Sequence, residues 1–220
     1  FDYWFGLSNG ANPSHRNPTN FMRNGKPVGP MKGYSCQIVV SDAINWLETK
    51  ANPDQPFFMN IWFNEPHSKL AAPDEITSIY GDLKDEGALY SATVDNTDRA
   101  IGRLVAKLKE TGKLDNTLII YSSDHGSYRT DRNGGLKGNK GSNFQGGLRS
   151  PGIFFWPNGF RGNRIEGTPS GAVDLLPTIC GLAGIDKPKG VHLDGADLSP
   201  LLIEKGTFKR SQPMLWLAPS

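Results

Sequence analysis

The feature that most constrains the fold is an apolar stripe through residues 85–111 of the 220-residue chain. Apolar side chains recur along it at the three- and four-residue intervals of an α-helix, and Gly112 fits the position after the last helical turn. A short turn then leads into residues 117–122, whose length and apolar, β-branched character are typical of a buried strand. A long amphipathic helix that feeds a short buried strand is the repeating unit of α/β proteins.

The same alternation recurs along the rest of the chain. Helical spacing predicts further helices over 35–50 and 172–184, and apolar runs predict strands over 56–64, 151–157 and 213–220. Together these elements predict an α/β fold with a mainly parallel sheet flanked by helices, because parallel strands need long crossover connections. Residues 1–33, rich in Gly, Pro and Asn, predict a surface loop.

The overall composition excludes several classes of protein. Hydrophobic residues make up 37% and charged residues 21% of the chain, which is typical of a globular protein and not of a disordered one. The net charge of +2 gives no reason to expect nucleic acid or a membrane surface as a partner. No apolar run reaches the length of a transmembrane span. Cys36 and Cys180 lack metal-binding spacing and are predicted to be buried free thiols.

Chemically active side chains follow two of the predicted strands. Asp124 and His125 come directly after the strand 117–122, and His67 follows the strand 56–64. Ligands of parallel α/β sheets bind at the carboxyl ends of strands, so these residues are predicted to share one site. The Asp-His pair offers a hard oxygen and a nitrogen to a cation. The alternative is a helix-capping aspartate beside an incidental surface histidine.

The loop after the Asp-His pair is rich in glycine and basic residues. Residues 134–151 contain six glycines around Lys137, Lys140 and Arg149, a combination that suits a tetrahedral oxyanion such as sulfate or phosphate. The alternative is a flexible, solvated loop with ordinary surface lysines. The segment also lacks the spacing of a P-loop. His67 fits a general acid, an anion contact or a hydrogen-bonded loop histidine, and on its own the last is the simplest interpretation.

Several segments, in order, resemble the sulfatases of the alkaline-phosphatase-like superfamily. They are Pro66-His67, TLIIYSSDHG at 117–126, GLKGNKGSNFQGGLRSPGIFFWP at 135–157, VDLLPTICGLAGI at 173–185 and LDG at 193–195. The resemblance covers nearly the whole chain and implies an incomplete alkaline-phosphatase-like fold. It also implies a sulfuric ester hydrolase that takes a sulfated small molecule or a sulfated carbohydrate.

The resemblance assigns roles position by position. Asp124 and His125 match ligands of a divalent cation, which is usually calcium in this family. Lys140 matches the lysine that contacts the substrate sulfate, and His67 matches the histidine that contacts the sulfate or protonates the leaving oxygen. Arg149 matches a recurrent structural arginine. Asp174, in the Asp-x-x-Pro-Thr segment, is interpreted as architectural.

The chain departs from the family pattern in two respects. Gln145 stands where the family usually has Glu. The nucleophile, a formylglycine made from Cys or Ser in a Cys/Ser-x-Pro/Ala-x-Arg motif, has no counterpart, because neither cysteine fits that motif. We therefore expect residues 1–205 to be the C-terminal two-thirds of a catalytic domain and 206–220 to begin a small C-terminal subdomain. The formylglycine and the remaining acidic metal ligands would lie upstream.

Two alternative functions stay open from the sequence. One is a phosphohydrolase or phosphonate hydrolase of the same superfamily, and the other is a non-catalytic relative that binds anions or carbohydrates. The loop 9–30 could line the rim of a site with His15, Arg16 and Arg23, although a solvated surface loop is the simpler interpretation. Family habit implies an exported protein, whether periplasmic, extracellular or lysosomal.

Overall fold

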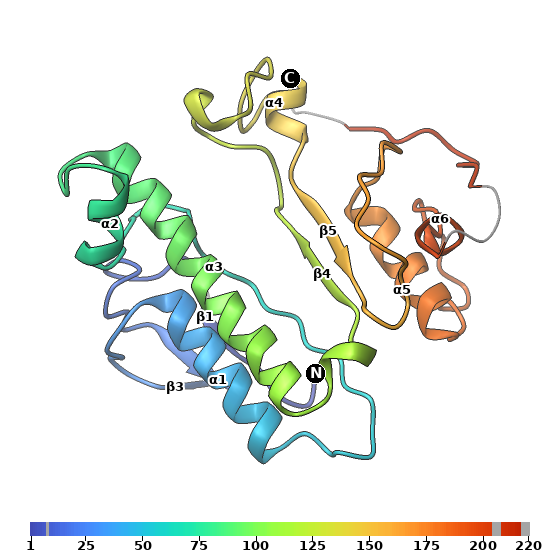
Figure 1. Cartoon of the computed structure of the whole chain (residues 1–220), viewed down its shortest axis with the longest axis horizontal. Helices are drawn as coiled ribbons and strands as arrows, with labels where there is room; N and C mark the ends of the chain where they lie inside the picture. The colour runs from blue at the N-terminus through green and yellow to red at the C-terminus, as the bar shows by residue number, and fades with distance from the viewer. Residues whose placement is uncertain (8, 204–207, 217–220) are drawn as a thin grey trace. The chain divides into compact units, whose positions relative to one another are not determined.

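The computed structural model describes residues 1–7, 9–203 and 208–216. The chain divides into two compact units, Phe1–Lys113 and Leu114–Ser220. Each unit is built around its own elements, coloured blue to green and green to red in Figure 1. His67 belongs to the first unit, and Asp124, His125 and Lys140 belong to the second.

The first unit opens with a small antiparallel sheet. Strands β1 (Phe5–Leu7), β2 (Phe21–Arg23) and β3 (Lys26–Pro27) are hydrogen-bonded in that order. The loop prediction for residues 1–33 is wrong for these strands. The signal that it missed is Asn24-Gly25, whose positive φ angles of 47° and 82° form the two-residue turn between β2 and β3.

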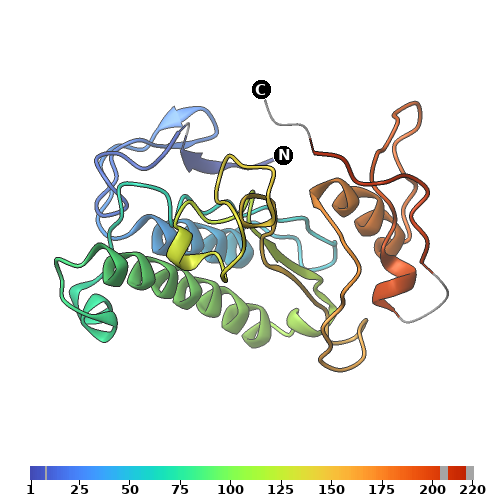
Figure 2. The ribbon, with the colours of Figure 1, turned by 90° about the horizontal axis from the view of Figure 1, so that it is seen from above.

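Two long helices form the centre of the first unit, and both were predicted. Helix α1 (Ser35–Thr49) packs along α3 (Glu86–Glu110), as Figures 1 and 2 show. Helix α2 (Asp74–Tyr80) covers the other end of α3. Apolar side chains between the helices form the core, and they come from Cys36, Val40, Ala100 and the partly buried Tyr34, Ile44, Phe63 and Leu104.

The strand predicted over 56–64 is not formed. These residues lie outside every helix and strand, although their exposure alternates along the chain as it does in a strand. Phe63 packs into the core while Trp62 is 80% exposed. A strand is defined by hydrogen bonds to a neighbouring strand, and none of the described residues supplies that neighbour.

The second unit is built on a two-stranded ribbon. Strands β4 (Ile119–Ser122) and β5 (Gly152–Phe155) pair in antiparallel register, with Ile119 opposite Phe155. All strand pairs among the described residues are antiparallel, whereas the sequence predicted a mainly parallel sheet. The physical reason is the connection: a loop, and not a crossover helix, joins β4 to β5, so the chain returns beside itself as a wide hairpin.

The connection between β4 and β5 holds most of the predicted site. It includes the short 3₁₀ helix η2 (Thr130–Arg132) and the one-turn helix α4 (Gln145–Leu148). Figure 1 shows this connection gathered at one end of the ribbon. The strands therefore act as a stem that presents one compact loop.

Three further helices complete the second unit's C-terminal half. The predicted helix at 172–184 is confirmed as η3 (Ala172–Asp174) and α5 (Leu175–Ala183), and the left-handed Gly184 ends it. Helix α6 (Ser199–Leu202) packs against α5. Of the strand predicted over 213–220, residues 213–216 form none and 217–220 lie outside the described residues. Within the described ranges, no helix is both long and apolar enough to cross a membrane.

Candidate active site

Asp124 and His125 lie at the end of β4, where the chain leaves the ribbon. The Asp124 side chain is 80% exposed and that of His125 is 37% exposed. Oδ1 of Asp124 accepts a hydrogen bond from the His125 backbone amide at 3.1 Å, and from Ser123 Oγ at 3.3 Å. The carboxylate is therefore oriented by its own neighbours and open to solvent.

The two side chains face each other in a way that requires a positive charge. Nδ1 of His125 lies 2.8 Å from the Gly126 carbonyl oxygen, which only accepts, so Nδ1 carries hydrogen. In a neutral imidazole the lone pair is then on Nε2, which lies 3.2 Å from Oδ2 of Asp124. Two lone pairs at that distance repel each other unless a proton or a metal cation lies between them. The pair thus has the geometry of two neighbouring cation ligands.

The glycines of the loop serve close backbone packing. A Cβ on Gly126 would lie 2.1 Å from the Gly146 carbonyl oxygen, and one on Gly146 would lie 2.0 Å from that of Gly138. The Gly126 amide donates to Gly147 O at 2.8 Å, and the Gly146 amide donates to Lys137 O at 2.8 Å. These amides are satisfied inside the loop, so they are not available to an anion.

The same packing sets the position of Lys140. Its backbone amide donates to the Ser127 carbonyl at 2.8 Å, which ties it to the segment just after the Asp-His pair. The Lys140 side chain is exposed, and no hydrogen bond or ion pair of its ammonium is formed within the part of the chain that the structure describes. Lys137 differs, because its Nζ lies 3.9 Å from the centre of the Phe144 ring.

Gln145 and Arg149 lie one helical turn apart on α4. The Arg149 guanidinium donates to Oε1 of Gln145 at 3.4 Å, and the Arg149 amide donates to the Gln145 carbonyl at 2.8 Å. A Glu at position 145 would form an ion pair there. With Gln the contact is a long neutral–charged hydrogen bond, and both side chains are exposed.

His67 lies in a loop of the first unit and is exposed. Its Nδ1 lies 2.8 Å from the Ser68 carbonyl oxygen and therefore carries hydrogen, which leaves Nε2 as the free ring nitrogen. Its backbone amide donates to the Asn64 carbonyl at 2.9 Å. The ring thus presents Nε2 to solvent as a group that can accept or, once protonated, donate a proton.

A buried polar cluster, which the sequence did not reveal, lies behind His67. It consists of His15, Ser35 and Glu65: His15 is 1% exposed, and the Glu65 side chain is 2% exposed. Nε2 of His15 contacts the His67 carbonyl oxygen at 2.6 Å. The prediction that His15 belongs to a rim or surface loop is wrong, because His15 is buried and contacts Ser35 of α1 and the carbonyls of His67 and Lys69. The overlooked signal was the charged Glu65 at the end of an apolar run.

The two cysteines are buried, as predicted. Burial raises the pKa of the Cys36 thiol to about 12, and the negative charge of Glu65 adds to the shift. A thiol with such a pKa is protonated at neutral pH and is a poor nucleophile. Cys36 is therefore a core residue and not a reactive one.

The residues present fit part of a metal site. Asp124 and His125 supply an oxygen and a nitrogen ligand, and the opposed lone pairs support a cation between them. Among the described residues, no group of three or more His, Cys, Asp or Glu side chains could hold a metal ion. Calcium takes six to eight oxygen ligands, so this pair would be a minority of its shell.

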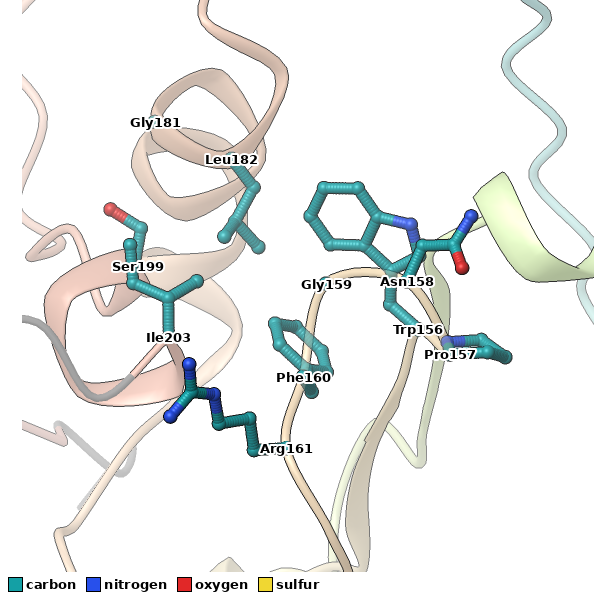
Figure 3. Close-up of a pocket in the computed structure, with 10 residues that line it drawn as sticks. All are labelled: Trp156, Pro157, Asn158, Gly159, Phe160, Arg161, Gly181, Leu182, Ser199 and Ile203. Carbon is teal, nitrogen blue, oxygen red and sulfur yellow. The ribbon is translucent and has the colours of Figure 1, made fainter.

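A cavity of the second unit lies away from these residues. It has a volume of about 450 Å³ and is open to solvent (Figure 3). Trp156 and Phe160 of the loop after β5 face Leu182 of α5 and Ile203 across it. It contains none of the predicted site residues.

Comparison with known proteins identifies the family. The sequence model of the Sulfatase family matches residues 1–185. The uncharacterized sulfatase YdeN of Escherichia coli is 29% identical over 99% of this chain, and human arylsulfatase A is 33% identical over 76% of it. The crystal structure of Ps i-CgsB in complex with k-i-k-neocarrahexaose superposes with a TM-score of 0.77 at 34% identity, over 84% of this chain.

The chain belongs to the sulfatase family, whose alkaline-phosphatase-like α/β fold it shares in part. It spans 39% of the length of YdeN, 32% of arylsulfatase A and 42% of the Ps i-CgsB chain. The predicted family and fold class are therefore confirmed. The individual roles of Asp124, His125, Lys140 and His67 stay predictions.

Proposed function

We propose that the protein containing this chain is a sulfuric ester hydrolase that cleaves sulfate esters of aryl or carbohydrate alcohols. The single observation that carries the proposal is the loop 123–151, which lies within the family match. In that loop the Lys140 amide donates a hydrogen bond to the Ser127 carbonyl, which holds the Lys140 segment next to the Asp124-His125 pair. A cation site and a mobile positive charge on one rigid loop suit an anionic ester.

The proposal extends to parts outside this chain. Residues 1–205 are proposed to form the C-terminal two-thirds of the catalytic domain, and 206–220 to begin a small C-terminal subdomain. The nucleophile is proposed to be a formylglycine supplied by another part of the protein. The chain spans 39% of YdeN and 32% of arylsulfatase A, which supports a nucleophile in another part of the protein.

Each candidate residue has a distinct task in this proposal. Asp124 and His125 hold a divalent cation, proposed to be calcium, which when bound supplies a Lewis acid that polarises the ester. Lys140 places its ammonium on the sulfate oxygens and offsets their charge. His67 holds a proton on Nε2 and donates it to the oxygen of the departing alcohol. A neutral Nε2 cannot make that donation, so the group must be protonated when the ester breaks.

The substrate class and the location also belong to the proposal. Ps i-CgsB was crystallised with k-i-k-neocarrahexaose, which supports a carbohydrate sulfate as the substrate. The arylsulfatase relative supports a small aromatic sulfate as an assay substrate. The protein is proposed to be exported, in the periplasm, outside the cell or in the lysosome.

The test is a comparison of two lysines of one loop in the full-length protein, with 4-nitrophenyl sulfate as substrate. Lys140→Ala should lower kcat/KM by roughly 100- to 1,000-fold, because the sulfate charge loses its partner. Lys137→Ala is the matched control, since its ammonium already lies on the Phe144 ring. Equal losses in both variants would contradict the role of Lys140.

The same assay separates the sulfatase from a phosphohydrolase. Wild-type protein should hydrolyse 4-nitrophenyl sulfate faster than 4-nitrophenyl phosphate. Faster turnover of the phosphate would favour a phosphohydrolase of the same superfamily. Turnover of neither ester by protein with a verified formylglycine would leave a non-catalytic anion-binding relative.

A further inference from the structure

The buried cluster of His15, Ser35 and Glu65 lies directly behind the loop that carries His67. We propose that His15 is a positioning residue, which fixes the His67 backbone so that its ring presents Nε2 to the ester. This inference rests on the proposed function, because it assigns His15 a role through the proposed proton donor. Nothing in the sequence pattern singled out this cluster.

The contact that carries the proposal is the one between His15 and the His67 backbone. A carbonyl oxygen only accepts, so Nε2 of His15 must donate to the His67 carbonyl at 2.6 Å. The His15 amide also lies 3.4 Å from the Lys69 carbonyl, two residues further along the same loop. The buried His15 thus contacts the backbone of the loop that carries His67, while the His67 ring stays exposed.

The His15 ring is itself held by Ser35 and Glu65. Nδ1 of His15 lies 3.0 Å from Ser35 Oγ, and Ser35 Oγ donates a short hydrogen bond to Oε1 of Glu65. The same Oε1 accepts the Cys36 amide of the first turn of α1 at 2.8 Å. The carboxylate therefore caps a helix whose own cap residue offers no side-chain bond, and the helix dipole favours its charge.

The side chains of the cluster are joined by one continuous series of contacts. The Nε2–O, Nδ1–Oγ and Oγ–Oε1 contacts need three hydrogens, of which a neutral imidazole and one hydroxyl supply two. The third is shared within the pair of His15 and Glu65, whose Nδ1 and Oε1 lie 3.6 Å apart. The ring and the carboxylate are therefore held together, and a buried polar group is costly only when it is unpaired.

The cluster also explains why Glu65 and His67 occur two residues apart. Glu65 anchors the start of the loop to α1, and His15 anchors the loop at the carbonyl of His67. The backbone between the two anchors has little freedom, so the position of the His67 ring is set before an ester arrives. Pre-set geometry of this kind lowers the reorganisation that a reaction requires.

The decisive experiment is a double-mutant cycle in the full-length protein with 4-nitrophenyl sulfate. His15→Leu should lower kcat by roughly 10- to 100-fold with little change in KM, because it displaces the proton donor. In the His67→Ala background the same change should have no further effect. An equal loss in both backgrounds would show a merely structural role and overturn the proposal. His15→Gln, whose amide can donate to the same carbonyl, should restore most of the activity.

Further measurements keep the test valid if the leucine variant does not fold. Ser35→Ala removes only the bridge between the His15 ring and the Glu65 carboxylate. It should lower kcat less than His15→Leu does, and it should have no effect in the His67→Ala background. Histidine ¹⁵N NMR should find Nε2 of His15 protonated, and an unprotonated Nε2 would overturn the contact with the His67 carbonyl. The exposed His192 provides the matched control, since His192→Leu should leave kcat unchanged.

Backbone hydrogen exchange separates the inference from the proposed function. The His67 amide, bonded to the Asn64 carbonyl, should exchange faster in the His15→Leu variant than in wild type or His192→Leu. Unchanged exchange would overturn the positioning role. If the wild-type protein hydrolyses no sulfate ester, the proposed function fails while the NMR and exchange results still decide whether His15 fixes the loop.

Discussion

At the residue scale, the site loop depends on glycines that leave room for neighbouring backbone. Gly126→Ala would place a Cβ 2.1 Å from the Gly146 carbonyl oxygen, and the backbone there cannot move without breaking the Gly126–Gly147 hydrogen bond. We expect a loss of about 1–3 kcal/mol in the free energy of unfolding. Thermal unfolding of the purified chain, followed by circular dichroism, measures it.

The matched control for this prediction is a glycine in an open environment. Gly102 lies on the exposed face of α3, and a Cβ there would meet nothing within 4 Å. Gly102→Ala should therefore stabilise the protein by about 0.5–1 kcal/mol through helix propensity. If both substitutions change the thermal unfolding midpoint in the same direction, close packing does not explain why residue 126 is a glycine.

The candidate site residues were predictable only where a chemically active side chain directly follows a predicted strand. Asp124 and His125 follow a strong strand signal, and the structure confirms that they lie at a strand's end. His15 and Glu65 were not predictable, because their contact joins positions 50 residues apart through tertiary packing. A single sequence shows periodicity and local turns, and it does not show which distant polar groups share a buried cluster.

At the element scale, Asp174 fixes the start of α5. Its buried carboxylate receives both guanidinium nitrogens of Arg210 at 2.7 Å and the amides of Gly171 and Ala196 at 2.9 and 2.7 Å. Burial alone would raise the pKa of Asp174, but the Arg210 ion pair and the amide donors outweigh it and lower that pKa. The interpretation of Asp174 as architectural is thus consistent with its contacts.

Replacement of this carboxylate gives the element-scale prediction. Asp174→Asn leaves Arg210 without its counter-charge, and we expect a loss of about 3–5 kcal/mol in the free energy of unfolding at pH 7. Because the native pKa lies below the unfolded value of about 3.9, the stabilisation is present above that pH and disappears as pH falls through the native pKa. Urea unfolding at pH 7 and at pH 3 should show the variant's deficit shrink in acid.

Asp194 supplies the comparison for that experiment. Its side chain is 78% exposed, and its ion pair with His192 lies at the surface, so Asp194→Asn should cost less than about 1 kcal/mol. A deficit for Asp174→Asn that is no larger than the one for Asp194→Asn would contradict the architectural role. So would a deficit that grows as the pH is lowered.

The elements differ in how well the sequence predicted them. The amphipathic helices α1, α3 and α5 were predicted to within a few residues, because their apolar stripes are local signals, as are the glycines that follow α3 and α5. The strand pairing was not predicted, since β4 and β5 pair across a 29-residue connection. The run at 56–64 has the alternation of a strand but no partner among the described residues, and alternation alone does not form a sheet.

At the scale of the whole molecule, the candidate residues belong to two compact units. His67 lies in Phe1–Lys113, whereas Asp124, His125 and Lys140 lie in Leu114–Ser220. The proposed function assigns His67 and Lys140 to the same ester. In a crystal structure of the full-length protein with bound sulfate, His67 Nε2 and Lys140 Nζ should both lie within about 3.5 Å of the same anion. Side chains that meet different anions would refute a common site.

Metal binding tests whether Asp124 and His125 are part of a larger ligand set. Asp124 and His125 offer two ligands, and calcium of useful affinity needs several more oxygens, so the 220-residue chain should bind calcium weakly or not at all. Isothermal titration with calcium chloride should give no Kd tighter than about 1 mM, the weak end of protein calcium sites. The full-length protein should bind more tightly, and Asp124→Asn should abolish that gain while Asp194→Asn preserves it. Tight binding by the 220-residue chain alone would contradict this prediction, because a complete ligand shell would then be present within these residues.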